Sequence, residues 1–143
     1  MEQPSAAMLV IGDELLSGRT HDANMHYLAK ELTEIGISLT EARFIRDDPA
    51  AIVSNIIELS KRFDYLFTSG GIGPTHDDIT TDCVAEAFGK QASIRHDALK
   101  ILQEYYDGKD IELNEARLRM ARIPETAEPV SYTHLRAHET HDD

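Results

Sequence analysis

The chain has 143 residues, a formal net charge of −12 at pH 7, 41% hydrophobic residues and 28% charged residues. This composition is typical of one globular domain, and the acidic balance argues against a nucleic-acid or anionic-membrane partner. No apolar run approaches the ~20 residues that cross a bilayer, and residues 1–5 do not resemble a signal peptide. The single cysteine, Cys83, excludes a disulfide framework and is expected in the core. We therefore expect a cytoplasmic protein.

Hydrophobic periodicity predicts three strands that alternate with helices. The strands are expected at 6–11, 37–45 and 64–68, and the helices at 22–35, 50–62, 80–88, 96–106 and 113–121. The helices at 22–35 and 80–88 end at Gly36 and Gly89, and Thr80 is expected to cap the second of them. Pro49 begins the helix at 50–62 after two aspartates. Right-handed crossovers between the strands predict a mostly parallel sheet with helices on both faces, which is the three-layer α/β/α class.

Each predicted strand is followed by a pair of acidic residues. The pairs are Asp13 and Glu14, Asp47 and Asp48, and Asp77 and Asp78. Because the carboxyl ends of parallel strands share one edge, where ligands bind in α/β sheets, we expect the three loops to converge. The first pair has the alternative of a solvated turn, and helix capping alone would explain the second. Asn24 has two roles open to it, capping its helix or reaching a ligand.

The loop after the third strand, residues 68–80, carries Gly70, Gly71 and Gly73 within four positions. Glycine adopts backbone conformations closed to other residues, and a strand-to-helix turn points N–H groups at a phosphate. The carboxylates of Asp77 and Asp78 would repel a bare phosphate, so we expect a divalent cation such as Mg²⁺ between them. The pattern is neither a Walker loop nor a dinucleotide fingerprint, and a plain turn is the alternative to a phosphate site.

The segments GDELLSG (12–18) and SGGIGPTHDDIT (69–80), with Asn24 and 47–48, resemble the molybdopterin-binding MoaB/Mog domain family. The likeness is closest to its CinA-like branch (competence/damage-inducible protein A) and runs from about residue 6 to residue 129. It implies a three-layer, usually oligomeric domain in which Asp47 and Asp78 are catalytic or metal-binding groups. It also implies a set of residues around the ligand phosphate and crevice: Ser69, Gly70, Gly71, Gly73, Thr75, Asp13, Glu14, Asn24 and Asp82.

The resemblance leaves the activity open. Family members that adenylylate molybdopterin hold the pterin phosphate in the Gly-Gly-x-Gly loop. Full-length CinA-like members resemble enzymes that hydrolyse ADP-ribose-type pyrophosphates, and a related domain accompanies FAD synthase. We therefore keep three hypotheses: binding of a phosphorylated pterin or nucleotide, metal-dependent pyrophosphate hydrolysis, and a non-catalytic regulatory domain. Adenylylation of a pterin and hydrolysis of a pyrophosphate would both use a divalent cation on a phosphoanhydride. His76 is either an acid–base group or a hydrogen-bonded loop residue.

Residues 130–143 do not resemble the family. Residues 130–140 resemble one reading frame of the reverse complement of a transposase library adapter, so we expect an artefactual tail. We assign no metal-binding role to its histidines, His134, His138 and His141. The domain at 1–129 would then lack the last strands and closing helix of the family fold, leaving an unpaired sheet edge. We expect such a chain to be poorly stable or prone to aggregate, and a cooperative thermal melt would contradict this.

Overall fold

The computed structural model describes residues 3–18, 22, 24–76, 78–109, 114 and 119–129. Its elements, in chain order, are β1 (Ser5–Ile11), α1 (Asp13–Leu16), α2 (Asn24–Glu34), β2 (Ser38–Ile45), α3 (Pro49–Arg62), β3 (Tyr65–Ser69), α4 (Thr80–Ala87), β4 (Ala92–Ile94), α5 (His96–Asp107), η1 (Arg119–Ala121) and β5 (Arg122–Pro124). The three predicted strands and the helices at 22–35, 50–62, 80–88 and 96–106 are confirmed. The helix predicted at 113–121 falls mostly outside the described residues, and its described end, η1, is a 3₁₀ turn.

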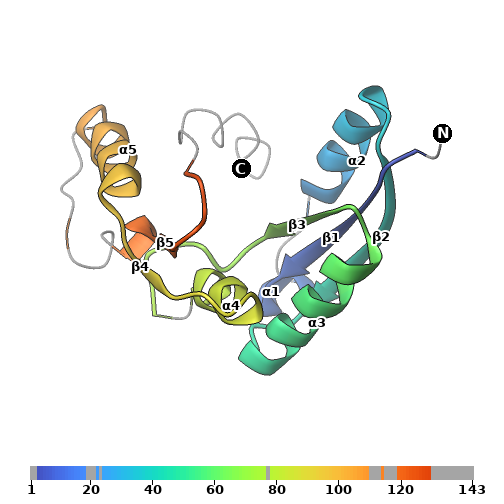
Figure 1. Ribbon diagram of the computed structural model, residues 1–143, viewed down its shortest axis with the longest axis horizontal. Coiled ribbons are helices and arrows are strands. Elements are labelled where there is room, and N and C mark those ends of the chain that lie inside the picture. Colours follow the sequence, from blue (N-terminus) through green and yellow to red (C-terminus); the bar gives the residue numbers. More distant parts are fainter. Residues whose placement is uncertain are drawn as a thin grey trace.

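Strands β1, β2 and β3 form a parallel sheet in the order β2-β1-β3, with helices α2 and α3 on its two sides (Figure 1). This confirms the predicted three-layer α/β/α arrangement. In the central strand β1, every residue from Ala6 to Ile11 is buried. Successive side chains of a strand point to opposite faces, so a strand buried along its length is covered on both faces. That is why its sequence is continuously apolar rather than alternating.

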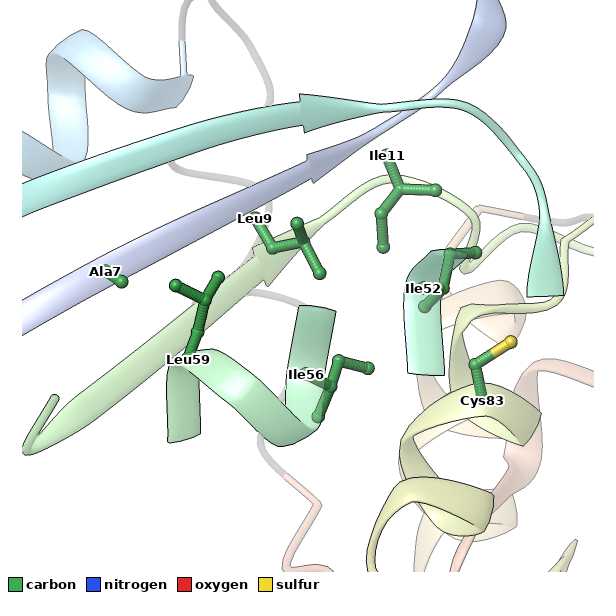
Figure 2. Packing of buried hydrophobic residues seen from close by; sticks show 7 residues of the cluster. All are labelled: Ala7, Leu9, Ile11, Ile52, Ile56, Leu59 and Cys83. Carbon is green, nitrogen blue, oxygen red and sulfur yellow. The ribbon is translucent and has the colours of Figure 1, made fainter. Parts of the chain in front are cut away.

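The main core lies between the sheet and helix α3 (Figure 2). It contains six side chains that are at most 1% exposed: Ala7, Leu9, Ile11, Ile52, Ile56 and Leu59. Each large aliphatic side chain buried there contributes about 1.5–3 kcal/mol to folding. Cys83 of α4 completes the cluster at 4% exposure, which confirms its predicted place in the core. Burial raises the pKa of the Cys83 thiol, so this side chain stays protonated and behaves as a small apolar group.

The edge strand β2 is attached to α3 by a network of ion pairs. The guanidinium of Arg43 donates to Glu41 at 2.5 Å, to Glu58 at 2.6 Å and to the amide oxygen of Asn55 at 2.7 Å. Arg62 reaches the same two carboxylates, Glu41 at 3.2 Å and Glu58 at 3.1 Å. The hydrogen bond from Arg43 is the main cause that lowers the pKa of Glu58. The network holds the middle of β2 to the helix that supplies Ile52, Ile56 and Leu59 to the core.

A second, antiparallel sheet pairs β4 with β5, and it was not predicted. Helix α5 packs beside this sheet: Ala98 and Leu102 meet the buried Ala121 of η1, and Ile123 of β5 packs against the same cluster. Figure 1 shows α4 lying between this unit and the parallel sheet. The position of α4 matters below, because α4 follows directly on the glycine-rich loop.

Candidate functional site

Strands β1 and β2 end in register at the carboxyl edge of the sheet. Ile11 pairs with Ile45, and the N–H of Gly12 donates to the Ile45 carbonyl oxygen at 3.0 Å. Asp13 and Asp47 therefore emerge side by side. The N–H of Asp13 donates to Oδ2 of Asp47 at 3.2 Å, and the N–H of Asp47 donates to Oδ1 of Asp13 at 3.1 Å. The structure thus brings these two predicted site residues together.

Each of these carboxylates uses only one of its two oxygens in this pair of hydrogen bonds. Within the described ranges, Oδ2 of Asp13 and Oδ1 of Asp47 accept no hydrogen bond. A cation, Arg46, has its Nε 3.6 Å from Oδ1 of Asp13, and its side chain is 79% exposed. Exposed pairs of this kind are weak, so Arg46 only partly offsets the charge of the two acids. The arrangement favours binding of a cation or of a ligand hydroxyl.

The other acidic residues of these two loops have local roles. Asp13 and Glu14 lie in the short helix α1 rather than in the predicted loop, and the carboxylate of Glu14 folds back so closely that a Cβ on Gly12 would lie 2.6 Å from it. Asp48 accepts the N–H of Ala51 at 2.9 Å and caps α3, as predicted from the proline that follows it. Capping therefore explains only one of the two aspartates at 47–48.

Helix α2 begins at Asn24, the residue for which capping and ligand binding were both left open. The carboxylate of Asp22 accepts the N–H of Met25 at 3.1 Å, so the described capping bond comes from Asp22. Nothing in the described geometry assigns Asn24 to a ligand.

The glycine-rich loop crosses the end of β1 at very short range. Gly70 has φ +93° and Gly71 has φ +67°, both in the region that disfavours side chains. A Cβ on Gly70 would lie 2.0 Å from the carbonyl oxygen of Ile11, and one on Gly71 would lie 2.2 Å from Oγ1 of Thr80. Both the conformation and the close approach therefore require glycine at these two positions.

Thr80 fixes this part of the loop from helix α4. Its side chain is 2% exposed, its hydroxyl donates to the carbonyl oxygen of Gly70 at 2.7 Å, and its N–H donates to the carbonyl oxygen of Gly71 at 3.0 Å. The prediction that Thr80 caps the helix is wrong: Ile79 occupies the cap position, without a capping bond from its side chain. The hydroxyl of Thr80 is used on the loop instead. Sequence reasoning missed this role because the partner carbonyls belong to the backbone.

Further along, Asp78 closes the loop on itself. Its Oδ2 accepts the N–H of Thr75 at 2.9 Å and the Thr75 hydroxyl at 2.8 Å, and a Cβ on Gly73 would lie 2.8 Å from the same oxygen. Ser69 is the last residue of β3, at the start of the loop. Asp77 lies outside the described residues. Asp78 thus stabilises the shape of the loop through its Oδ2.

The result of this folding is a run of backbone donors that face no acceptor. In the part of the chain that the structure describes, the N–H groups of Gly71, Ile72 and Gly73 donate to no protein group. The side chain of Ile72 is 48% exposed, so the loop is open to solvent. Successive N–H groups in a turn with positive φ form a concavity that suits an anion.

The described residues contain no group of three or more His, Cys, Asp or Glu side chains placed to hold a metal ion. Mg²⁺, however, is usually held by one or two carboxylates, with ligand phosphates and water completing its shell. The Asp13–Asp47 pair fits that smaller demand. The predicted metal role of Asp78 stays a prediction: its Oδ2 is bonded to Thr75, as one oxygen of Asp13 and one of Asp47 are bonded to backbone N–H groups.

Asp82 was expected to line the crevice, but both of its carboxylate oxygens are taken. Oδ1 accepts from Nη2 of Arg122 at 2.7 Å, and Oδ2 accepts from Nη1 at 3.2 Å. Sequence reasoning gave Arg122 no role, and no local pattern could have done so, because the two residues are 40 positions apart.

The chain is similar to several known proteins over most of its length. The chain is similar to protein PH0439 of Pyrococcus horikoshii, with 39% identity over 136 residues, 90% of this chain and 53% of that protein. It is 35% identical over 122 residues to a CinA-like protein of Kosmotoga olearia, covering 85% of this chain and 30% of that protein. The chain spans about half the length of the first of these curated relatives and about a third of the second.

Solved structures share the fold. The structure of CinA from Thermoplasma acidophilum superposes with a TM-score of 0.79 at 30% identity, over 90% of this chain and 75% of that one. MoaB from Pyrococcus furiosus, described as a tungsten cofactor synthesizing protein, has a TM-score of 0.58 at 19% identity, over 76% and 66% of the two chains, which shows the fold alone.

No helix among the described residues is both long and apolar enough to cross a membrane. A family model described as a probable molybdopterin binding domain matches residues 7–138. The carboxyl-edge loops described above lie within that match. The chain therefore belongs to the probable molybdopterin-binding domain family, and it has CinA-like relatives.

Proposed function

We propose that this domain binds a phosphorylated pterin or nucleotide, with the phosphate on the backbone of residues 70–73. The observation that carries the proposal is the run of three N–H groups, at Gly71, Ile72 and Gly73, that meet no acceptor in the described part of the chain. Three such groups at the carboxyl edge of a parallel sheet are a general means of binding phosphate. Membership of a probable molybdopterin-binding family favours a pterin as the rest of the ligand.

The charge of the protein explains why backbone donors and a cation would act together. The chain carries a net charge of −12, so an anionic ligand needs local compensation. Backbone N–H groups supply part of it without adding a charged side chain. Asp13 and Asp47 would hold Mg²⁺ or another divalent cation through their remaining oxygens, and the cation would neutralise phosphate charge when bound.

Metal-dependent hydrolysis of an ADP-ribose-type pyrophosphate is the second candidate. It is favoured by the placement of two carboxylates, Asp13 and Asp47, on the strand ends next to the glycine loop. One carboxylate beside a bound phosphate would suffice to hold a cation, whereas a pair can also orient a water molecule. A domain that only binds would use the same residues without turnover, which is the third candidate.

Calorimetric titration separates these candidates. The chain would be titrated with molybdopterin and with ADP-ribose, each with and without Mg²⁺, and ADP-ribose samples would be assayed for AMP and ribose 5-phosphate. We expect Mg²⁺-dependent binding of one ligand. Product formation from ADP-ribose would favour hydrolysis, whereas binding without product would favour a non-catalytic domain.

A matched pair of variants tests where the ligand sits. Gly71→Ala and Gly89→Ala both place a side chain at φ +67°, but only the first meets a neighbour, because nothing lies within 4 Å of a Cβ on Gly89. We expect Gly71→Ala to abolish measurable binding and Gly89→Ala to retain it. Equal affinities in the two variants would show that the loop is not the phosphate site.

A further inference from the structure

Helix α4 packs on the main core through Cys83, and its polar side chains contact two further neighbours. At its first residue, Thr80 donates to the carbonyl oxygens of Gly70 and Gly71, at 2.7 Å and 3.0 Å. Two residues later, Asp82 accepts two hydrogen bonds from Arg122 of β5. Residues two apart on a helix point to different sides of it. The helix is therefore held from the glycine loop on one side and from the second sheet on another.

The Arg122 side of this arrangement is geometrically specific. Its guanidinium binds both oxygens of Asp82, at 2.7 Å and 3.2 Å, and Nη2 also lies 3.4 Å from the carbonyl oxygen of Ala92 in β4. Two parallel N–H bonds from a planar guanidinium fix orientation as well as distance, which lysine cannot reproduce. One side chain thus ties both strands of the second sheet to α4.

We propose that Asp82 and Arg122 are a positioning pair for the phosphate-binding loop. The second sheet fixes α4 through this pair, and α4 fixes the carbonyl groups of Gly70 and Gly71 through Thr80. The direction of those carbonyls sets the direction of the N–H groups that follow them in the chain. Neither residue of the pair touches the ligand. The effect on binding rests on the function proposed above, but the mechanical link can be measured without any ligand.

The first test is amide hydrogen exchange in the unliganded 143-residue chain. The N–H of Thr80 is bonded to the loop, so its exchange reports whether α4 and the loop stay together. We expect Arg122→Ala to speed exchange at Thr80 on the order of tenfold while Leu9 of β1 keeps its rate. The reversed pair, Asp82→Arg with Arg122→Asp, should restore protection.

A matched control guards against a general loss of stability. Arg43→Ala removes a side chain with more ion-pair partners, which lie on β2 and α3 and not on α4 or the glycine loop. It should leave exchange at Thr80 unchanged. Unchanged exchange at Thr80 in Arg122→Ala, or an equal change in Arg43→Ala, would overturn the proposal.

The second test is binding of molybdopterin and of ADP-ribose, each titrated with Mg²⁺. Arg122→Ala should weaken the affinity on the order of tenfold, and the reversed pair should recover it. Faster exchange at Thr80 with wild-type affinity would overturn the positioning role. If neither ligand binds the wild-type chain, the proposed function fails, and exchange at Thr80 alone then decides whether the pair holds the loop.

Discussion

The two ends of the central strand are both closed by aspartates, but in different ways. At the amino end, Oδ2 of Asp64 accepts the N–H of Ser5 at 2.9 Å and its hydroxyl at 3.3 Å, while the N–H of Asp64 donates to the Ser5 carbonyl oxygen at 3.1 Å. At the carboxyl end, two carboxylates, Asp13 and Asp47, each accept one N–H from the other residue.

The difference lies in what is left over. At the amino end, Ser5 and Asp64 donate hydrogen bonds to each other, and only one carboxylate is involved. The carboxyl end places two like charges together and leaves the N–H groups of Gly71, Ile72 and Gly73 without a partner among the described residues. Polar groups that a fold could pair but leaves open are where a ligand is to be sought. The comparison teaches that one end of the sheet pairs its polar groups with each other, whereas the other leaves backbone donors and carboxylate oxygens open.

The largest loss of stability is expected from a side chain at Gly70, where the loop contacts the carboxyl end of β1. Gly70→Ala would force a side chain to φ +93° and to 2.0 Å from a backbone oxygen, which cannot move aside as a side chain would. The strained conformation and the overpacking together should lower the free energy of unfolding by about 3 kcal/mol or more. Urea denaturation measures this loss.

Its control lies at the amino end, where Gly36 has φ +86° and open space around it. Gly36→Ala should cost about 1–2 kcal/mol, for the backbone conformation alone. If the two variants lose the same stability, the approach of the loop to β1 is not a tight constraint.

A smaller effect is expected from removing one charge at each end. Asp47→Asn and Asp64→Asn both keep an oxygen that can accept the existing backbone bond. Asp47→Asn should weaken Mg²⁺-dependent ligand binding on the order of tenfold, and Asp64→Asn should leave it unchanged. Calorimetry with each variant tests this, and a loss of affinity in both would mean that the two ends do not differ in function.

The smallest effect is expected midway along β2, at neither end. Arg43 holds the pKa of Glu58 below its ordinary value of about 4.3, so the folded state binds fewer protons there than the unfolded state. The stabilisation is present above that ordinary pKa and is lost as pH falls through the lowered one. Glu58→Gln should therefore flatten the fall in stability below about pH 5, as measured by urea unfolding across pH. A curve parallel to that of the wild type would contradict this.

Local patterns predicted much of the fold. The apolar run of β1, the helical spacing of Ile52, Ile56 and Leu59, and the Asp48–Pro49 helix start each lie within one element. Such patterns follow from backbone geometry and burial, which act over a few residues. The convergence of Asp13 and Asp47 was also predicted from the sequence, because the carboxyl ends of parallel strands share one edge of the sheet.

The rest depends on contacts between distant residues. Strands β4 and β5 have three residues each and show no alternation, so only their pairing with each other reveals them. The ion pair of Asp82 with Arg122 has the same character. The contact of Asp78 Oδ2 with Thr75, three positions back, was likewise not predicted, although the family resemblance marked Asp78 as a site residue. A charge pattern shows where carboxylates lie in the sequence, but it does not show which donors they bind in the folded protein.

The central claim is that the backbone of residues 70–73 holds the ligand phosphate. The most direct measurement is an NMR titration of the isotopically labelled chain with molybdopterin or ADP-ribose in the presence of Mg²⁺. The account predicts that the amide signals of Gly71, Ile72 and Gly73 shift most. Shifts that are largest elsewhere, with these three amides unmoved at saturation, would contradict it.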